Sequence, residues 1–297
     1  MKVINIGSLN IDRTYSVKEF VRPKETIKAL KYEEHCGGKG LNQTIALRKA
    51  GANVYHAGII GHDGQMLINE LKAADASTEY IKMTDGNSGH AMIQVDEKGE
   101  NNIIIHGGTN DHISKEFITD VLDRFEGKDI LLLQNEITNV DVAMRYAKKK
   151  GMTIIFNPSP MNDKIFQYPL ELVDYFLINE LEAAELAGTE KTGVDEILRQ
   201  LKIKYPKAAF VMTLGGDGVW FCNQERKQFH PSFKVAVADT TGAGDTFCGY
   251  FIAGLVDDID VEMNLRRASA AAAIAVSRHG AAQSIPTKEE VETFLNK

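Results

Sequence analysis

Short apolar segments alternate with helix-like segments along most of this chain, and this alternation strongly limits the folds open to it. Strand-like segments lie at 3–6, 54–60, 130–133, 153–156, 175–178 and 209–213, and helix-like segments at 41–50, 66–74, 140–149, 181–187, 194–203 and 268–276. Strands that are apolar on both faces are typical of parallel sheets covered by helices on both sides. We therefore predict an α/β fold, a three-layer α/β/α arrangement with a mostly parallel central sheet.

Two regions depart from this alternation. The runs 17–21 and 26–32 look extended and polar around Pro23, and 91–105 reads as two extended runs joined across residues 97–100, a hairpin signal. We expect these regions to form a separate small β-sheet that acts as a lid over the main domain, with lid segments at 13–35 and 89–106. Because no internal repeat or linker is visible, residues 1–297 are expected to form a single domain.

One glycine-rich turn has features that suit phosphate chemistry. Residues 239–247 read Asp-Thr-Thr-Gly-Ala-Gly-Asp-Thr-Phe and join a strand-like run at 233–238 to an apolar helix at 247–256. The free N–H groups and the dipole of a helix start attract anions, and a carboxylate beside such a site can accept a hydroxyl proton during phosphoryl transfer. The same residues also fit an ordinary capped helix start, so this turn alone leaves both interpretations open.

Composition excludes several function classes. The chain has 34 basic and 41 acidic residues and a net charge of −7, which argues against the clustered basic face of a nucleic-acid-binding protein. Its three cysteines, Cys36, Cys222 and Cys248, are scattered, so we expect neither a disulfide framework nor a zinc site and favour a cytoplasmic location. No apolar run approaches the roughly 20 residues that a membrane span needs.

Other phosphate-binding and hydrolytic signatures are missing. No Gly-Lys pair is followed by Ser or Thr, no Gly-x-Gly-x-x-Gly follows the first strand, and His-Glu-x-x-His and Gly-x-Ser-x-Gly do not occur. Instead, polar residues and glycines follow the expected strands, where open α/β sheets bind their ligands. They are Asn10, Asp12, Lys39, Asn42, Glu136, Asn179, Glu182, Gly215, Gly216, Gly218 and Asp245. Each alone fits a loop or a cap, but together they predict a pocket for a polyhydroxylated ligand and a nucleotide.

Four motifs, in order along the chain, resemble those of the ribokinase-type (PfkB) carbohydrate kinases. Residues 37–43 (Gly-Gly-Lys-Gly-Leu-Asn-Gln) are similar to the first family signature and residues 239–247 to the second. Residues 179–182 match the N-x-x-E motif, and 213–219 resemble the nucleotide loop. The resemblance runs from Gly7 to Gly280. It implies a ribokinase-like fold and ATP-dependent phosphorylation, most similar to members that convert D-ribose to D-ribose 5-phosphate.

The resemblance also implies roles for individual residues. The sugar hydroxyls would be held by Asn10, Asp12, Gly38, Lys39, Asn42 and Glu136. Asp245 would be the general base, and the N–H groups of Gly242, Ala243 and Gly244 would form the anion hole. The ATP site would be lined by Asn179, Thr213, Gly215, Gly218 and Ser269, and Glu182 would organise Mg²⁺ through water. An activating K⁺ would be held by Asp239, Thr241, Ala275, Arg278, Gly280 and Ser284, and the lid sheet would form a homodimer contact.

Two alternatives stay open at the level of sequence. A related kinase of the family could act on another sugar or a nucleoside, because residues 87–92 differ from the Ser-Thr-Gly-type run expected at the lid and Met92 can reshape the sugar pocket. A non-catalytic sugar- or nucleotide-sensing protein is the other alternative. It would be expected to have lost Asp245, Gly242 or Gly244, and all three are present.

Overall fold

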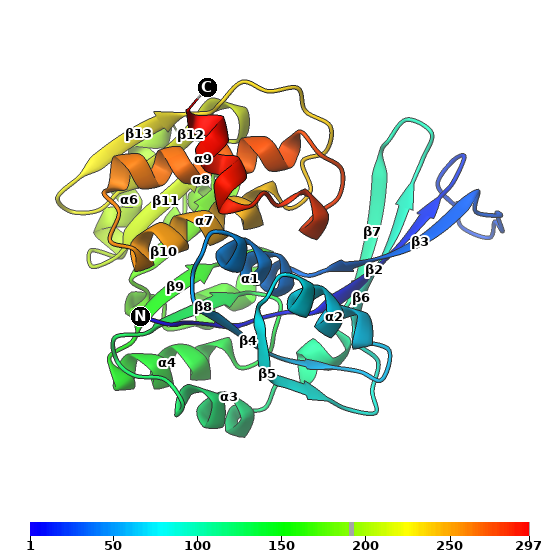
Figure 1. The fold of residues 1–297 in the computed structure, drawn as a ribbon, viewed down its shortest axis with the longest axis horizontal. Helices are drawn as coiled ribbons and strands as arrows, with labels where there is room; N and C mark the ends of the chain where they lie inside the picture. The colour runs from blue at the N-terminus through cyan, green and yellow to red at the C-terminus, as the bar shows by residue number, and fades with distance from the viewer. Residues whose placement is uncertain (190–192, 297) are drawn as a thin grey trace.

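The computed structural model describes residues 1–189 and 193–296. It contains a nine-stranded sheet in the order β13-β12-β11-β10-β9-β8-β1-β4-β5 and a four-stranded sheet in the order β3-β2-β6-β7. In Figure 1 the large sheet and its helices form the body of the molecule, and the small sheet projects from one side. The predicted α/β fold, with a mostly parallel central sheet and a second small sheet, is confirmed.

The large sheet is parallel except around β12. Its strands are β1 (Val3–Ile6), β4 (Val54–Ile60), β5 (Ser77–Met83), β8 (Ile130–Gln134), β9 (Thr153–Asn157), β10 (Tyr175–Asn179), β11 (Ala209–Thr213), β12 (Gly218–Cys222) and β13 (Lys227–Pro231). Strand β12 runs antiparallel to both of its neighbours, and the other pairs are parallel. Central strands such as β1 and β8 are buried along their whole length, which explains their continuous apolar sequences.

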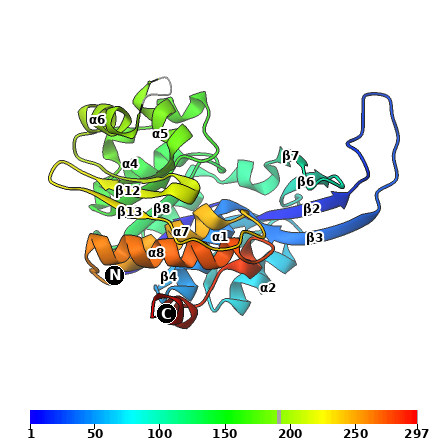
Figure 2. The ribbon, with the colours of Figure 1, turned by 90° about the horizontal axis from the view of Figure 1, so that it is seen from above.

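Helices cover both faces of this sheet, as Figure 2 shows from above. One face carries α1 (Lys39–Lys49), α2 (Gln65–Ala73), α7 (Ala243–Val256), α8 (Val261–Val276) and α9 (Lys288–Leu295), and the other carries α3 (Lys115–Leu122), α4 (Val140–Lys150), α5 (Glu180–Ala187) and α6 (Val194–Lys204). The core is accordingly divided in two by the sheet. Leu132 packs in the cluster with α1 and α7, whereas Leu131 packs in the cluster with α4. The alternation of side chains along each strand therefore supplies both cores.

The small sheet consists of β2 (Asn10–Ser16), β3 (Lys31–Gly37), β6 (Gly89–Val95) and β7 (Asn101–His106). Strand β2 pairs antiparallel with β3 and parallel with β6, and β6 pairs antiparallel with β7. Strand β6 follows β5, and β7 leads into the 3₁₀ helix Gly108–His112. Two of the connections between this sheet and the body lie close together, because β2 begins shortly after β1 and β3 leads through Gly38 into α1. The first residues of β2 and the last of β3 therefore lie beside the carboxyl end of β1.

The predicted extended runs at 17–21 and 26–32 are wrong apart from the last two residues of the second, which begin β3. The segment between β2 and β3 is an exposed loop. Pro23 has no N–H to offer a strand ladder, and Lys24 has a positive φ of 69°, so a regular strand cannot pass through this point. Val17 is buried, but Val21, Ile27 and Leu30 are exposed and do not mark a buried strand face.

The predicted strand at 233–238 is also wrong, since this segment has no regular structure. Strand β13 ends at Pro231, and the chain then passes over the end of α8. The backbone N–H groups of Ala238 and Asp239 both donate to the carbonyl of Val276, at 2.8 and 3.2 Å. The segment thus pairs with a helix end and has no neighbouring strand to complete a ladder.

Candidate active site

Two adjoining cavities lie where the carboxyl ends of the central strands meet the start of α7. The large cavity has a volume of 440 Å³ and the small cavity 230 Å³. Both are lined by Thr213, Thr240, Gly244 and Phe247, so they meet at the beginning of α7. This edge of a parallel sheet is where α/β proteins bind ligands.

The turn that starts α7 lies between the two cavities. Gly242 is the N-cap residue with a left-handed φ of 73°, and a Cβ there would lie 3.1 Å from Ala281. No side chain of the described residues caps this helix, and a Cβ at Gly244 would find none of their atoms within 4 Å. The Ala243 N–H makes one long bond of 3.3 Å to Thr240. A helix start that is uncapped and open to a cavity is an anion-binding arrangement.

Asp245 lies in the first turn of α7 and lines the small cavity. Its Oδ2 accepts a hydrogen bond from Asn42 Nδ2 at 3.1 Å, and its Oδ1 accepts one from Gln43 Nε2 at 2.9 Å. Both donors are neutral amides of α1. Asn42 Oδ1 is buried and has no hydrogen-bond partner among the described residues. Asn42 therefore presents a free acceptor beside the Asp245 carboxylate, where a hydroxyl could donate.

Close packing of α1 against α7 makes these contacts possible. A Cβ at Gly249 would lie 2.3 Å from the Cβ of Ala46, a distance that no side chain tolerates. The residues of both helices at this contact are buried. Only glycine at position 249 lets the two helices approach so closely, and this approach places Asn42 against Asp245, 203 residues away in sequence.

Charged side chains gather around the small cavity. Burial alone lowers the pKa of Lys39, but the carboxylates of Asp245, Glu136 and Glu182 raise it overall. Burial raises the pKa of Glu136, although Lys39 and hydrogen bonds from Ser8 and the Lys39 backbone N–H oppose this. One partly buried lysine among three carboxylates leaves several acceptors for ligand hydroxyl groups in and beside this cavity.

Asn10 and Asp12 lie at the start of β2, beside this cluster. Burial, followed by the charge of Glu136, raises the pKa of Asp12 to about 6. Asn10 Oδ1 accepts a hydrogen bond from Asn110 Nδ2 at 2.8 Å, and Asn110 Oδ1 accepts one from the Leu9 N–H at 3.1 Å. Asn10 is thereby left with its N–H donors for a ligand.

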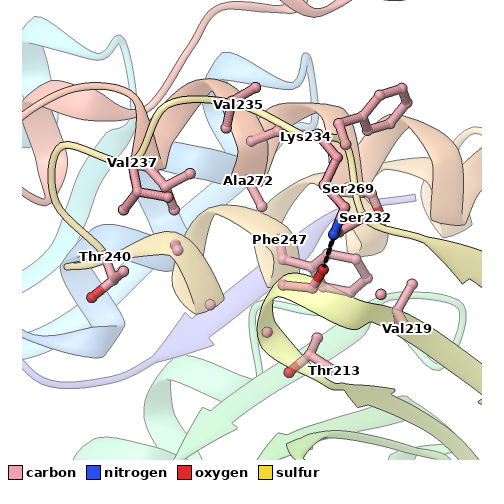
Figure 3. Close-up of a pocket in the computed structure, with 18 residues that line it drawn as sticks. Thr213, Val219, Ser232, Lys234, Val235, Val237, Thr240, Phe247, Ser269 and Ala272 are labelled. Carbon is pink, nitrogen blue, oxygen red and sulfur yellow. Dashed lines mark hydrogen bonds between the residues drawn. The ribbon is translucent and has the colours of Figure 1, made fainter.

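The large cavity has a largely apolar lining (Figure 3), which includes Val219, Val235, Val237, Phe247 and Ala272. Of the residues predicted for the nucleotide, Thr213, Gly215, Gly218 and Ser269 line this cavity, whereas Asn179 lines the small one. Sequence reasoning missed the contribution of residues 232–237, because this segment was expected to be a strand. Lys234 Nζ donates to the Gly216 carbonyl at 3.0 Å across the rim.

Asn179 and Glu182 form a capping box at the start of α5. Asn179 Oδ1 accepts from the Glu182 N–H, and Glu182 Oε2 accepts from the Asn179 N–H, both at 2.9 Å. Among the described residues there is no cluster of three His, Cys, Asp or Glu side chains that could hold a metal ion. Mg²⁺ in nucleotide sites keeps several waters and uses one or two carboxylates plus phosphate oxygens. Glu182, which lines the small cavity, fits that mode.

The positions expected to hold K⁺ lie on the loop before α7, in the last turn of α8 and in the segment that follows α8. Asp239 accepts hydrogen bonds from the N–H and hydroxyl of Thr241, at 2.9 and 2.7 Å, and from the Gly280 N–H at 3.0 Å. Burial alone raises the pKa of Asp239, but these hydrogen bonds lower it overall. The Arg278 guanidinium pairs with Glu290 at 2.6 Å, and the Ser284 hydroxyl donates to the Ala281 carbonyl. Arg278 therefore has only its backbone to offer a cation here.

The sequence prediction gave no individual role to four polar residues of this region: Ser8, Gln43, Asn110 and Asn157. Gln43 lies inside the first motif, so a signal was present, but its partner Asp245 is 202 residues away. Ser8 and Glu136 are likewise 128 residues apart. Their roles depend on contacts that no local pattern displays.

The chain is similar to known proteins over nearly its whole length. Residues 1–288 match the sequence pattern of the pfkB family of carbohydrate kinases. A ribokinase of Haemophilus influenzae is 33% identical over 300 residues, which cover 98% of this chain and 97% of that protein. The crystal structure of a Cryptococcus neoformans ribokinase in complex with ADP matches with a TM-score of 0.87 and 30% identity, covering 98% and 99% of the two chains. The Arabidopsis thaliana ribokinase complexed with ribose and ATP matches with a TM-score of 0.86 and 27% identity, covering 100% and 99%.

Proposed function

The chain belongs to the pfkB family of carbohydrate kinases, and from this premise we propose that it transfers the γ-phosphoryl group of ATP to O5 of D-ribose. The products are ADP and D-ribose 5-phosphate. The observation that carries the proposal is the uncapped start of α7, open to both cavities, with Asp245 in its first turn. Support also comes from the relatives named ribokinase, which match almost end to end and include complexes with ADP and with ribose and ATP.

Asp245 is the general base of the proposed mechanism. Its carboxylate accepts the proton of the sugar hydroxyl as that oxygen attacks the γ-phosphorus, and the bond between the γ-phosphorus and the bridging oxygen of ADP breaks. The N–H groups of Gly242, Ala243 and Gly244 stabilise the charge on the transferred group, with Lys39 nearby. Mg²⁺ bound with ATP supplies further neutralisation of phosphate charge, and Glu182 would hold it through water.

The two substrates bind at separate sets of residues that meet at Asp245 and the start of α7. The sugar binds between the small sheet and α1, and its hydroxyls meet acceptors and donors from Asn10, Asp12, Gly38, Lys39, Asn42 and Glu136. ATP occupies the large cavity, along Thr213, Gly215, Gly218 and Ser269, with Asn179 on the side of the small cavity. An apolar lining suits a flat base, and the shared wall at Gly244 leads the phosphates toward Asp245.

We extend the proposal to the parts around the site. The small sheet acts as a lid within a single domain, through segments 13–35 and 89–106, and forms a homodimer contact. Exposed apolar side chains on this sheet, Met92, Ile103, Ile104 and Ile105, support that contact.

K⁺ activates the enzyme through Asp239, Thr241, Ala275, Arg278, Gly280 and Ser284. Three buried free cysteines support a cytoplasmic location. No helix of the described residues is long and apolar enough to cross a bilayer.

The test is ADP release with a panel of acceptors in K⁺ buffer and again in Na⁺ buffer. The panel contains D-ribose, 2-deoxy-D-ribose, fructose 6-phosphate and a nucleoside. We expect the highest kcat/KM with D-ribose and a higher rate in K⁺. A higher kcat/KM with another acceptor would contradict the ribose assignment and direct attention to the lid residues around Met92. Protein that binds ATP but turns over with no acceptor would instead be a sensor.

A further inference from the structure

A chain of buried amide side chains leads away from Asp245 into the body of the protein. Gln43 is fully buried, and its Nε2 donates to Asp245 Oδ1 at 2.9 Å and to Asn157 Oδ1 at 3.2 Å. Gln43 Oε1 accepts from Gln134 Nε2 at 2.7 Å, and the same Gln134 nitrogen donates to Asn5 Oδ1 at 3.1 Å. The sugar- and ATP-binding residues proposed above include none of these four amides.

One end of this chain is fixed by the backbone of β10. Asn157 Nδ2 donates to the Leu177 carbonyl at 2.8 Å. A carbonyl oxygen can only accept, which removes the usual ambiguity between the oxygen and the nitrogen of an amide. Asn157 must therefore turn its Oδ1 toward Gln43, and Gln43 must donate to it from its NH₂ group.

The other end is fixed independently by the backbone of α1. Asn5 Nδ2 donates to the Gly40 carbonyl at 2.8 Å, so Asn5 Oδ1 faces Gln134. Gln134 must then point its NH₂ group at both Asn5 and Gln43, which turns Gln43 Oε1 toward Gln134. Both anchors thus require the same orientation of Gln43, with its N–H donor aimed at Asp245. A rotation of this one amide would break hydrogen bonds at both ends.

We propose that Gln43 is a positioning residue for the general base, which holds the Asp245 carboxylate in one orientation through an amide that cannot flip. Asn42 cannot do this alone, because its Oδ1 has no partner among the residues the structure describes and its amide is not held at both ends. A fixed N–H donor also favours the charged form of a carboxylate. The inference rests on the proposed role of Asp245 as the base.

Other ionisable groups also act on Asp245. Lys39 from α1, Glu136 from the loop after β8, Glu182 from α5 and Cys248 from α7 surround it. They set an electrostatic background that a change at Gln43 leaves in place. If a neutral substitution at Gln43 shifts the pH dependence of kcat, the shift can therefore be assigned to the lost amide donor.

The experiment compares Gln43→Met with Thr44→Val. Methionine keeps the length of glutamine but removes the donor. Thr44 is the next residue of α1, is equally buried, and hydrogen-bonds to Asn5 and His56 but, among the described residues, not to Asp245. Without the Thr44 hydroxyl, Asn5 Nδ2 still donates to the Gly40 carbonyl, so this anchor stays in place. We measure kcat and the KM values for D-ribose and ATP across pH, together with the melting temperature of each variant.

Gln43→Met should lower kcat about tenfold or more, the scale for losing a hydrogen bond to a charged group. Both KM values should stay within about twofold of the wild type, and the acid limb of the kcat profile should move to higher pH. Thr44→Val should lose stability without either change. Equal kcat losses in the two variants, or an acid limb that does not move in Gln43→Met, would overturn the proposal.

Two further variants keep the outcome interpretable. Gln134→Met removes one of the two clamps on Gln43 without touching Asp245, and should move kcat and the acid limb in the same direction by less. An unchanged pH profile of kcat in this variant would contradict the proposal that Gln134 helps to fix the Gln43 amide, even if Gln43→Met fails to fold. Asp245→Asn separates the two claims. If Asp245→Asn keeps a near-normal kcat, Asp245 is not the base. If Asp245→Asn is inactive but Gln43→Met has a normal kcat and pH profile, only the positioning role of Gln43 is refuted.

Discussion

Replacing Asp245 by asparagine removes the proposed proton acceptor while keeping the size of the side chain. In the protein both carboxylate oxygens accept hydrogen bonds, from Asn42 and Gln43. An asparagine amide has only one acceptor, so one of the two contacts must change. Gln43 is held at both ends and keeps its donor in place, whereas Asn42 Oδ1 has no partner in the described part of the chain, so this amide can rotate to accept. We therefore expect the variant to fold with its hydrogen bonds remade.

The expected cost in rate is much larger than the cost in stability. General-base assistance contributes about 10²- to 10⁴-fold, which corresponds to about 2.7–5.4 kcal/mol of activation free energy. The hydrogen bonds around position 245 can all be re-formed, so the free energy of unfolding should fall by about 1 kcal/mol or less. D-ribose still meets Asn10, Asp12, Lys39 and Glu136, so its affinity should change little.

The assay combines steady-state ADP release with calorimetric titration of D-ribose and a thermal melt. We predict a fall in kcat of at least about 100-fold with nearly unchanged ribose binding. A variant that turns over within about threefold of the wild type would remove Asp245 from the mechanism. A rate loss matched by an equal loss of ribose affinity would assign Asp245 to binding and not to proton transfer.

Two other changes test the electrostatics and the packing of the site. The pKa of Asp12 is raised by burial and by Glu136 from 3.8 to about 6, so its charged form opposes folding above pH 6, and this cost is relieved as the pH falls toward 4. Asp12→Asn should thus raise the free energy of unfolding at pH 7.5 by up to about 3 kcal/mol, and with it the melting temperature, but not at pH 4. It should also weaken ribose binding. An equal gain in stability at both pH values would contradict this. Gly249→Ala places a methyl group 2.3 Å from Ala46 and should cost about 1–3 kcal/mol of stability and lower kcat by separating α1 from α7. Gly193→Ala, whose Cβ has no described atom within 4 Å, is the control, and equal kcat values in these two variants would show that the α1–α7 approach does not position the site.

Local patterns predicted the elements whose burial is uniform. Strands such as β8 are buried at every residue and read as continuous apolar runs. Strand β5 (Ser77–Met83) escaped prediction because it is an edge strand without a fully buried residue, so no apolar run marks it. The start of α9 does carry a local signal, the capping box of Thr287 and Glu290, but strand and helix alternation alone does not reveal it.

The same distinction holds for the site, where local motifs could be predicted and long-range contacts could not. The glycine turns and Asp245 are contiguous in sequence, and the resemblance to a family drew attention to them directly. Ser8 lies in an ordinary turn, and Gln43 lies in the first motif without a local sign of its partner; both matter because the fold brings β1 beside β8 and packs α1 on α7. Long-range contacts of this kind follow from topology, so only the structure could show which of these residues touch.

The central claim is that this protein transfers the γ-phosphoryl group of ATP to O5 of D-ribose. The most direct measurement is the identity of the product, determined by phosphorus and proton NMR after incubation with D-ribose, ATP, Mg²⁺ and K⁺. The account predicts D-ribose 5-phosphate and one ADP for each sugar phosphate formed. ADP formation without a sugar phosphate, or phosphate on the anomeric oxygen instead of O5, would contradict it.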